Sequence, residues 1–138
     1  MKPNSIWQPQ QPKFHNQLDF NIGDPASYHC VIYRYSRSHR ELAIAVRNYM
    51  NNDELAFYLM FESVWYFQGS TSWSSVDFEF ADIDERKALI QKVFLNIRDN
   101  NLMDSMVQQC ALYFIYKPNI TIQILAGNCY TVKDISAS

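Results

Sequence analysis

The sequence predicts an α+β fold: an antiparallel β-sheet of about six strands, in the order ββββαββ, with one main helix packed on one face. Three observations predict it. Apolar residues alternate up to residue 80, take helical spacing between residues 83 and 97, and alternate again from residue 112. Short polar connections favour antiparallel neighbours. The chain has 138 residues, 48% of them hydrophobic, which suits one domain with a substantial core.

Residues 1–27 are rich in proline, glutamine and asparagine, and we expect them to form an N-terminal tail. Proline lacks a backbone donor and restricts the residue before it, so neither a helix nor a central strand fits this segment. A solvated linker would carry few large apolar side chains, yet this tail contains Trp7, Phe14, Leu18, Phe20 and Ile22. We therefore expect the tail to be partly packed, and residues 28–138 to form a single α+β domain.

The first two strands are expected to form a hairpin closed by a turn at residues 37–40. Placing every bulky apolar side chain on one face sets the register. The expected pairs are Tyr35 with Leu42, Tyr33 with Ile44 and Val31 with Val46. This register turns both tyrosines toward the core. The alternate residues of this strand, Cys30, Ile32 and Arg34, then lie on the outer face.

The third strand is expected to be long, from about residue 55 to residue 68, after an Asn-rich turn at residues 51–53. The serine-rich segment 69–75 reads as a loop. A short fourth strand follows at residues 76–80, where apolar and acidic side chains alternate.

A helix should begin after Asp82, because Asp82 followed by Glu85 forms a capping box and acidic residues fill the first turn. Its apolar stripe consists of Leu89, Ile90, Val93, Phe94 and Ile97. A short second helix is expected over residues 103–110, and the last two strands over residues 112–116 and 120–124.

The outer side of the third strand lacks the polar side chains expected of a face in contact with water. It carries large apolar or amphipathic residues, which are the interface candidates Tyr58, Met60, Val64 and Tyr66. Exposed apolar patches of this kind usually mark interaction sites. The cover could be the N-terminal tail, a second subunit, a partner protein, or the sheet itself if it curves around a cavity.

A cluster of basic residues in the first hairpin is the strongest candidate for a charged site. It consists of Arg34, Arg37, His39, Arg40 and Arg47. Arginine beside aromatic rings can bind phosphate or stack on bases, and it is also common at protein interfaces. Because the expected register separates the arginines from Tyr33 and Tyr35, a solvated face, a protein interface and a phosphate or nucleic-acid contact all stay open.

Motifs for catalysis, metals and cofactors are not visible in the sequence. The three cysteines and three histidines lack zinc-type spacing, and no glycine-rich phosphate loop or nucleophile elbow occurs. The net charge of -2 excludes a globally basic nucleic-acid binder. We expect no catalytic residue, no metal site and no cofactor, although residues distant in sequence could still meet in an active site.

The cellular compartment is predicted from three features. The first residues lack the apolar segment of a signal peptide, and the longest apolar runs are far shorter than the ~20 residues that span a bilayer. We expect a cytoplasmic protein without a membrane span, and an odd number of cysteines agrees with a reducing compartment.

Three functional hypotheses follow. The favoured one is a non-catalytic protein-interaction module that forms a homodimer, or binds an unidentified protein, through the outer sheet face. The alternative is a small carrier or sensor that holds an apolar ligand between a curved sheet and the helix, lined by Trp65, Phe67 and Phe78. A phosphate or nucleic-acid contact through the arginine-rich hairpin is the weakest, and nucleic acid is the least favoured partner.

Overall fold

The computed structural model describes residues 5–7, 22, 24–94, 100–133 and 135. Their strands form two antiparallel sheets. The five-stranded sheet has the order β5-β1-β2-β3-β9. Its strands are β1 (Tyr28–Ser36), β2 (Glu41–Asn48), β3 (Glu54–Glu62), β5 (Ser72–Ser74) and β9 (Asn128–Val132). The four-stranded sheet has the order β4-β8-β7-β6. Its strands are β4 (Tyr66–Gln68), β6 (Glu79–Phe80), β7 (Ala111–Lys117) and β8 (Ile120–Ala126).

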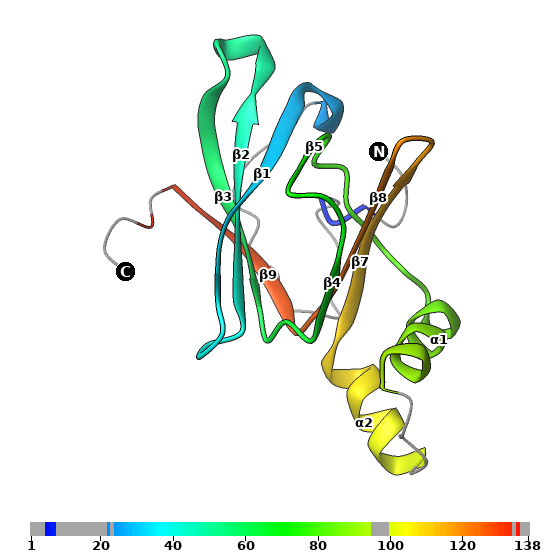
Figure 1. The fold of residues 1–138 in the computed structure, drawn as a ribbon. Helices are drawn as coiled ribbons and strands as arrows, with labels where there is room; N and C mark the ends of the chain where they lie inside the picture. The colour runs from blue at the N-terminus through cyan, green and yellow to red at the C-terminus, as the bar shows by residue number, and fades with distance from the viewer. Residues whose placement is uncertain (1–4, 8–21, 23, 95–99, 134, 136–138) are drawn as a thin grey trace.

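The described helices are α1 (Ile83–Val93), α2 (Asn100–Gln109) and two short 3-10 helices, η1 (Pro25–Ser27) and η2 (Tyr49–Asn51). Helices α1 and α2 lie on the side of the four-stranded sheet that faces away from the five-stranded sheet (Figure 1). The layers are therefore sheet, sheet and helix. None of the described helices is long and apolar enough to cross a membrane.

The α+β class and the antiparallel pairing are confirmed, but the strands differ in number and arrangement. The described residues contain nine strands in two sheets, where we expected about six in one. The cause lies in the expected long third strand. Ser63 adopts a left-handed backbone with φ +53°, which cannot continue a strand. The chain therefore ends β3 at Glu62 and enters β4 in the other sheet at Tyr66.

A second crossing between the sheets packs against the first. Strand β8 ends at Ala126 and β9 begins at Asn128, so the chain changes sheets at Gly127. The Gly127 amide donates to the Glu62 carbonyl at 2.9 Å. A Cβ at Gly127 would lie 3.2 Å from the Cβ of Ser63, so the small residue allows the two crossings to approach closely.

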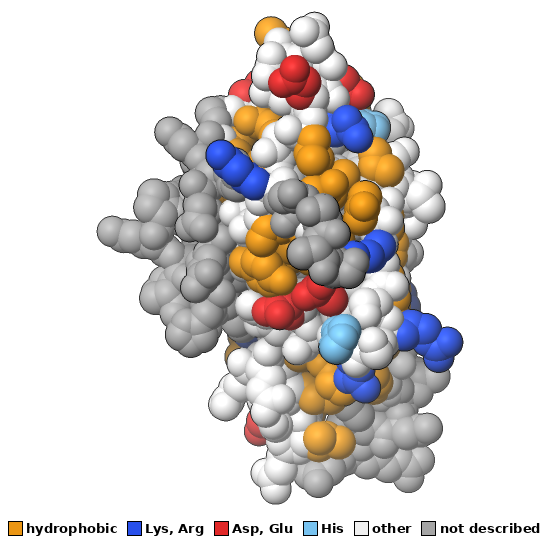
Figure 2. Space-filling view, turned by 90° about the vertical axis from the view of Figure 1, so that its left-hand side faces the viewer, with side chains coloured by type: hydrophobic (Ala, Val, Ile, Leu, Met, Phe, Trp, Pro, Cys, Tyr) orange, Lys and Arg blue, Asp and Glu red, His pale blue; other side chains and the backbone are white. Residues whose placement is uncertain are grey.

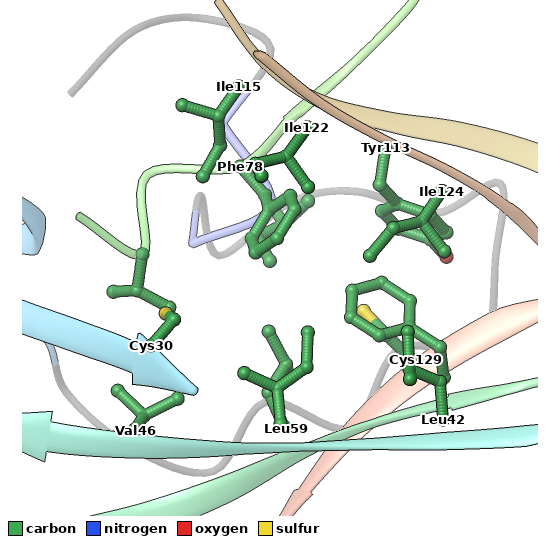
Figure 3. Packing of buried hydrophobic residues seen from close by; sticks show 14 of the residues in the cluster. Cys30, Leu42, Val46, Leu59, Phe78, Tyr113, Ile115, Ile122, Ile124 and Cys129 are labelled. Atoms are coloured by element: carbon green, nitrogen blue, oxygen red, sulfur yellow. The ribbon is translucent and has the colours of Figure 1, made fainter. Parts of the chain in front are cut away.

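Large apolar side chains fill the space between the sheets. Residues such as Val46, Leu59 and Cys129 face Ile115, Tyr113 and Ile124 across this core (Figure 3). Phe61 makes edge-to-face contacts with Phe78 and Tyr113, with ring centroids 5.6 and 5.0 Å apart. Such rings interlock the two sheets, because each one buries a large apolar area in a specific geometry.

Part of the N-terminal segment belongs to this core. Ile6, Trp7 and Ile22 are buried within the same apolar cluster. The Trp7 indole donates to the Val76 carbonyl at 2.9 Å, and its ring packs edge-to-face with Phe57, with centroids 5.8 Å apart. Phe14, Leu18 and Phe20 lie outside the described residues.

The expected helix start is confirmed. The Asp82 side chain accepts a hydrogen bond from the Glu85 amide at 2.8 Å, which satisfies a backbone donor that the helix leaves free. The second helix is also confirmed, although it begins at Asn100 rather than near residue 103. Ile97, expected in the apolar stripe of the first helix, lies outside the described residues.

The expected hairpin register is correct at one end and wrong at the other. Tyr35 pairs with Leu42 as expected, but the register shifts between Ile32 and Arg34. On the N-terminal side of this β-bulge in β1, the pairs are Ile32 with Ile44 and Cys30 with Val46. Tyr33 is the extra residue of the bulge. Cys30 and Ile32 thus pack in or against the core, and the tyrosine hydroxyl, which needs a polar partner, stays out of it.

Candidate functional site

The candidate site is the face of the five-stranded sheet that points away from the core, which we call the outer face. The alternation of β1, β2, β3 and β9 places on it Val31, Tyr33, Arg34, Glu41, Ala43, Ala45, Tyr58, Met60, Glu62, Tyr130 and Val132. A space-filling view from this side shows hydrophobic side chains gathered over the sheet, with basic and acidic side chains beside them (Figure 2).

The bulge in β1 determines the most exposed residue of the outer face. Tyr33 is 53% exposed, and its ring meets Tyr58 edge-on with centroids 5.1 Å apart. The expected placement of Tyr33 in the core and of Cys30 and Ile32 on the outer face is therefore wrong. A bulge is decided by packing against the opposite sheet, which simple alternation cannot reveal.

Two of the four interface candidates lie on the outer face. Tyr58 is half-buried beside Tyr33, whereas Met60 is only 2% exposed. Ala43 and Ala45 pair with Met60 and Tyr58 and are also buried. The tyrosine rings are therefore the accessible aromatic part of the outer face, whereas Ala43, Ala45 and Met60 beside them are buried.

The other two interface candidates lie elsewhere, because the strand was expected to continue through Ser63. Val64 is buried in the core between the sheets. Tyr66 begins β4 and packs against the cluster under the helices. The structure therefore does not bring Val64 and Tyr66 together with Tyr58 and Met60.

Charged groups surround Tyr130 on the outer face. Its hydroxyl donates to Glu41 Oε2 at 3.2 Å, and Asn128 Nδ2 donates to Glu62 Oε1 at 3.0 Å. Burial, followed by the carboxylates of Glu41 and Glu62, raises the pKa of Tyr130 to about 12, while Arg34 opposes this shift. The outer face thus carries one cation and two anions beside its aromatic rings.

The five basic-patch candidates fall into three places. Arg34 lies on the outer face. Arg37, His39 and Arg40 lie in the exposed turn between β1 and β2. Arg47 lies at the other end of β2, where its Nη1 donates to the Asp53 carbonyl at 3.2 Å. The structure therefore separates the residues that the sequence places in one hairpin, because a hairpin of this length spans the sheet from end to end.

The three ligand-cavity candidates do not surround a common space. Phe78 is fully buried in the core, and Phe67 packs against that core from β4. Trp65 is 42% exposed in the connection between β3 and β4. The Arg40 guanidinium lies 4.1 Å from the centre of the Trp65 ring, which is a cation–π contact between two predicted sites that the sequence did not connect.

Polar chemistry elsewhere in the described residues is limited. They contain no group of three or more His, Cys, Asp or Glu side chains able to hold a metal ion. Burial raises the pKa of the Cys30 thiol far above its usual range and that of Cys129 to about 12. Both thiols are therefore neutral at pH 7 and are poor nucleophiles.

One polar cluster escaped the sequence analysis. The Tyr49 hydroxyl lies 2.8 Å from His29 Nδ1 and 3.1 Å from Ser74 Oγ. Ser74 belongs to β5, which pairs with β1, whereas we expected a loop there. A pairing between segments more than forty residues apart leaves no local signal in a single sequence.

A scan against protein-family models and searches of curated proteins and of solved structures found no match to this chain.

Proposed function

We propose that this protein is a non-catalytic interaction module that self-associates by pairing the outer faces of two copies. One observation carries the proposal. An antiparallel sheet with one face on a core normally turns polar side chains outward, but here the outward side chains include Tyr33, Tyr58 and Tyr130. Tyrosine is enriched at protein interfaces, because it buries a large ring while its hydroxyl tolerates water.

A second copy is the proposed partner because the charges of the outer face complement one another. Arg34 lies on the same face as Glu41 and Glu62. A two-fold axis places the same patch of each copy against the other. Such an axis lets Arg34 of each copy approach the carboxylates of its partner, which favours the correct register.

The tyrosines should supply most of the association energy. Met60 and Ala43 are already buried in the single chain, so a partner adds little to their burial. Tyr33 is exposed and is held against Tyr58 by its edge-on contact. A rigid aromatic residue at the centre of an interface is typical of a binding hot spot.

The test compares two substitutions in the same strand. Tyr33→Glu places a charge on the outer face, whereas Tyr35→Glu changes a similarly exposed residue, 48% against 53%, that pairs with Leu42 on the opposite face. We expect sedimentation equilibrium and native mass spectrometry to show a dimer for the unchanged protein. Tyr33→Glu should weaken the dimer by at least about tenfold, and Tyr35→Glu should not.

Three results would overturn the proposal. The first is a monomer for the unchanged protein across the micromolar range. The second is a dimer that Tyr33→Glu leaves intact while circular dichroism shows that the variant is folded. A dimer lost equally in both variants would also contradict it, because the outer face would then not be the contact.

A further inference from the structure

We propose that a hollow at one end of the sandwich binds a small organic oxyanion, a compound with a phosphate or carboxylate group, through Arg40 and Trp65. The hollow has a volume of about 330 Å³, which lies at the lower end of the range for small-molecule sites. The β1–β2 turn, the β3–β4 connection and the end of α2 form its walls, with Ser38, His39, Arg40, Ser63, Trp65 and Gln109 among the lining residues. This site is separate from the outer face and does not depend on self-association.

Arg40 supplies the charge. Its guanidinium stacks over the Trp65 ring at 4.1 Å. The guanidinium itself has no hydrogen bond or ion pair with any residue that the structure describes. A stacked guanidinium keeps its N–H groups free at the edge, and these groups match the two oxygens of a carboxylate or phosphate. His39, from the same turn, also lines the hollow and adds ring nitrogens that can donate hydrogen bonds.

The backbone around Arg40 and Trp65 holds these two side chains in place before any ligand binds. Arg40 and Ser63 both adopt left-handed conformations, with φ of 49° and 53°. The Val64 amide donates to the Arg40 carbonyl at 2.9 Å, and the Trp65 amide donates to the Leu125 carbonyl at 2.8 Å. The rings of Phe94 and Trp65 pack edge-to-face with their centroids 5.9 Å apart. Strained residues fixed by their surroundings are common at binding sites, and preorganisation lowers the entropic cost of binding.

The remaining wall accepts a negative charge. Its polar side chains are hydroxyl, amide, imidazole and guanidinium groups, and no carboxylate is among the described lining residues. The end of α2 would oppose an anion, because helix C-termini are electronegative. Arg86 reduces this effect, since its buried guanidinium donates through Nη1 to the Cys110 carbonyl at 3.1 Å. The hollow is therefore suited to an anion whose organic part lies against Trp65.

The experiment follows the Trp65 indole N–H by NMR while four small probes are added to the full chain. Phenyl phosphate and benzoate carry the two oxyanions, benzyl alcohol is neutral and benzylamine is cationic. We expect saturable shifts with one or both anions at millimolar concentration and none with the other two probes. The indole signal is assigned by its loss in Trp65→Phe. Whichever anion binds more tightly identifies the group that the site prefers.

Arg40→Gln should weaken anion binding by at least about tenfold, and Arg40→Lys should give an intermediate affinity. Arg47→Gln is the matched control, because Arg47 lies at the opposite end of β2. The proposal is overturned if neither anion gives a saturable shift, if benzyl alcohol binds as well as the anions, or if folded Arg40→Gln retains full affinity. None of these results depends on whether the outer face forms a dimer.

Discussion

Each sheet has one face that points away from the shared core, and these two faces have different surroundings. On the four-stranded sheet, α1 and α2 bury Leu112 and Leu125. On the five-stranded sheet, no helix of the described residues covers the outer face (Figure 1), and its accessible side chains include Tyr33, which is exposed, and Tyr58 and Tyr130, which are half-buried. Leucine suits a permanently buried contact, whereas tyrosine can be partly wet alone and buried in a complex. The side-chain types thus distinguish a face that the chain covers itself from one that we propose a second copy covers.

The largest expected effect comes from removing a contact under the helices. Leu125 is fully buried between Leu112 and Tyr66 in the four-stranded sheet. Leu125→Ala should lower the free energy of unfolding by about 2–5 kcal/mol, because it leaves a cavity where helix and sheet meet. Urea denaturation measures this change. Leu55→Ala is the control, since Leu55 is 37% exposed at the start of β3. Equal losses in the two variants would contradict the assigned role of the helices.

A smaller effect tests the charged part of the outer face. Burial and the carboxylates of Glu41 and Glu62 raise the pKa of Tyr130 from its ordinary 10 to about 12. The folded state therefore favours the neutral phenol over the tyrosinate. Below the unfolded pKa the phenol is neutral in both states and the protein keeps its full stability. As pH rises from the unfolded pKa through the folded one, the unfolded chain loses its proton first, and the free energy of unfolding falls. We expect the unchanged protein to lose stability relative to Tyr130→Phe as pH rises above about 10.

Urea unfolding of both proteins at several alkaline pH values measures this difference. Glu41→Gln keeps the tyrosine but removes one of the two nearby carboxylates, so its pH-dependent loss should be smaller than that of the unchanged protein. Parallel stability curves for the unchanged protein and Tyr130→Phe would show that the environment of Tyr130 is the same in the folded and unfolded chains.

The sequence predicted those parts of the fold that depend on neighbouring residues. The Asp82 cap follows from two residues three positions apart, and the core-facing side of β2 follows from simple alternation. The division into two sheets was missed because it depends on Ser63, a residue type with no special preference for a left-handed backbone. The bulge at Tyr33 was missed because the opposite sheet determines which face is buried.

The same distinction explains what was predicted at the candidate site. Tyr58 and Met60 alternate correctly because β3 is regular between residues 57 and 61. Val64 and Tyr66 come after the break, so the same alternation assigned them to the wrong surface. The contact of Arg40 with Trp65 joins a turn to a connection between sheets, and only the folded chain brings them together.

The smallest expected effect on stability is that of truncating Tyr33. Tyr33 is more than half exposed, and its edge contact with Tyr58 is its one ring contact among the described residues. Tyr33→Ala should therefore change the free energy of unfolding of the single chain by less than about 1 kcal/mol. Urea denaturation at low protein concentration, where the chain is monomeric, measures this change, and sedimentation at high concentration should show a weaker dimer.

Measuring both the stability of the monomer and the strength of the dimer separates association from folding. Truncating a residue that stabilises the fold lowers the free energy of unfolding of the monomer, as expected for Leu125. Truncating a residue that serves an interface weakens the dimer but leaves the stability of the monomer unchanged, because the apolar area of that residue is buried only in the complex. If Tyr33→Ala destabilises the monomer as strongly as Leu125→Ala, the outer face is part of the folding core, and the contrast between the two sheets disappears.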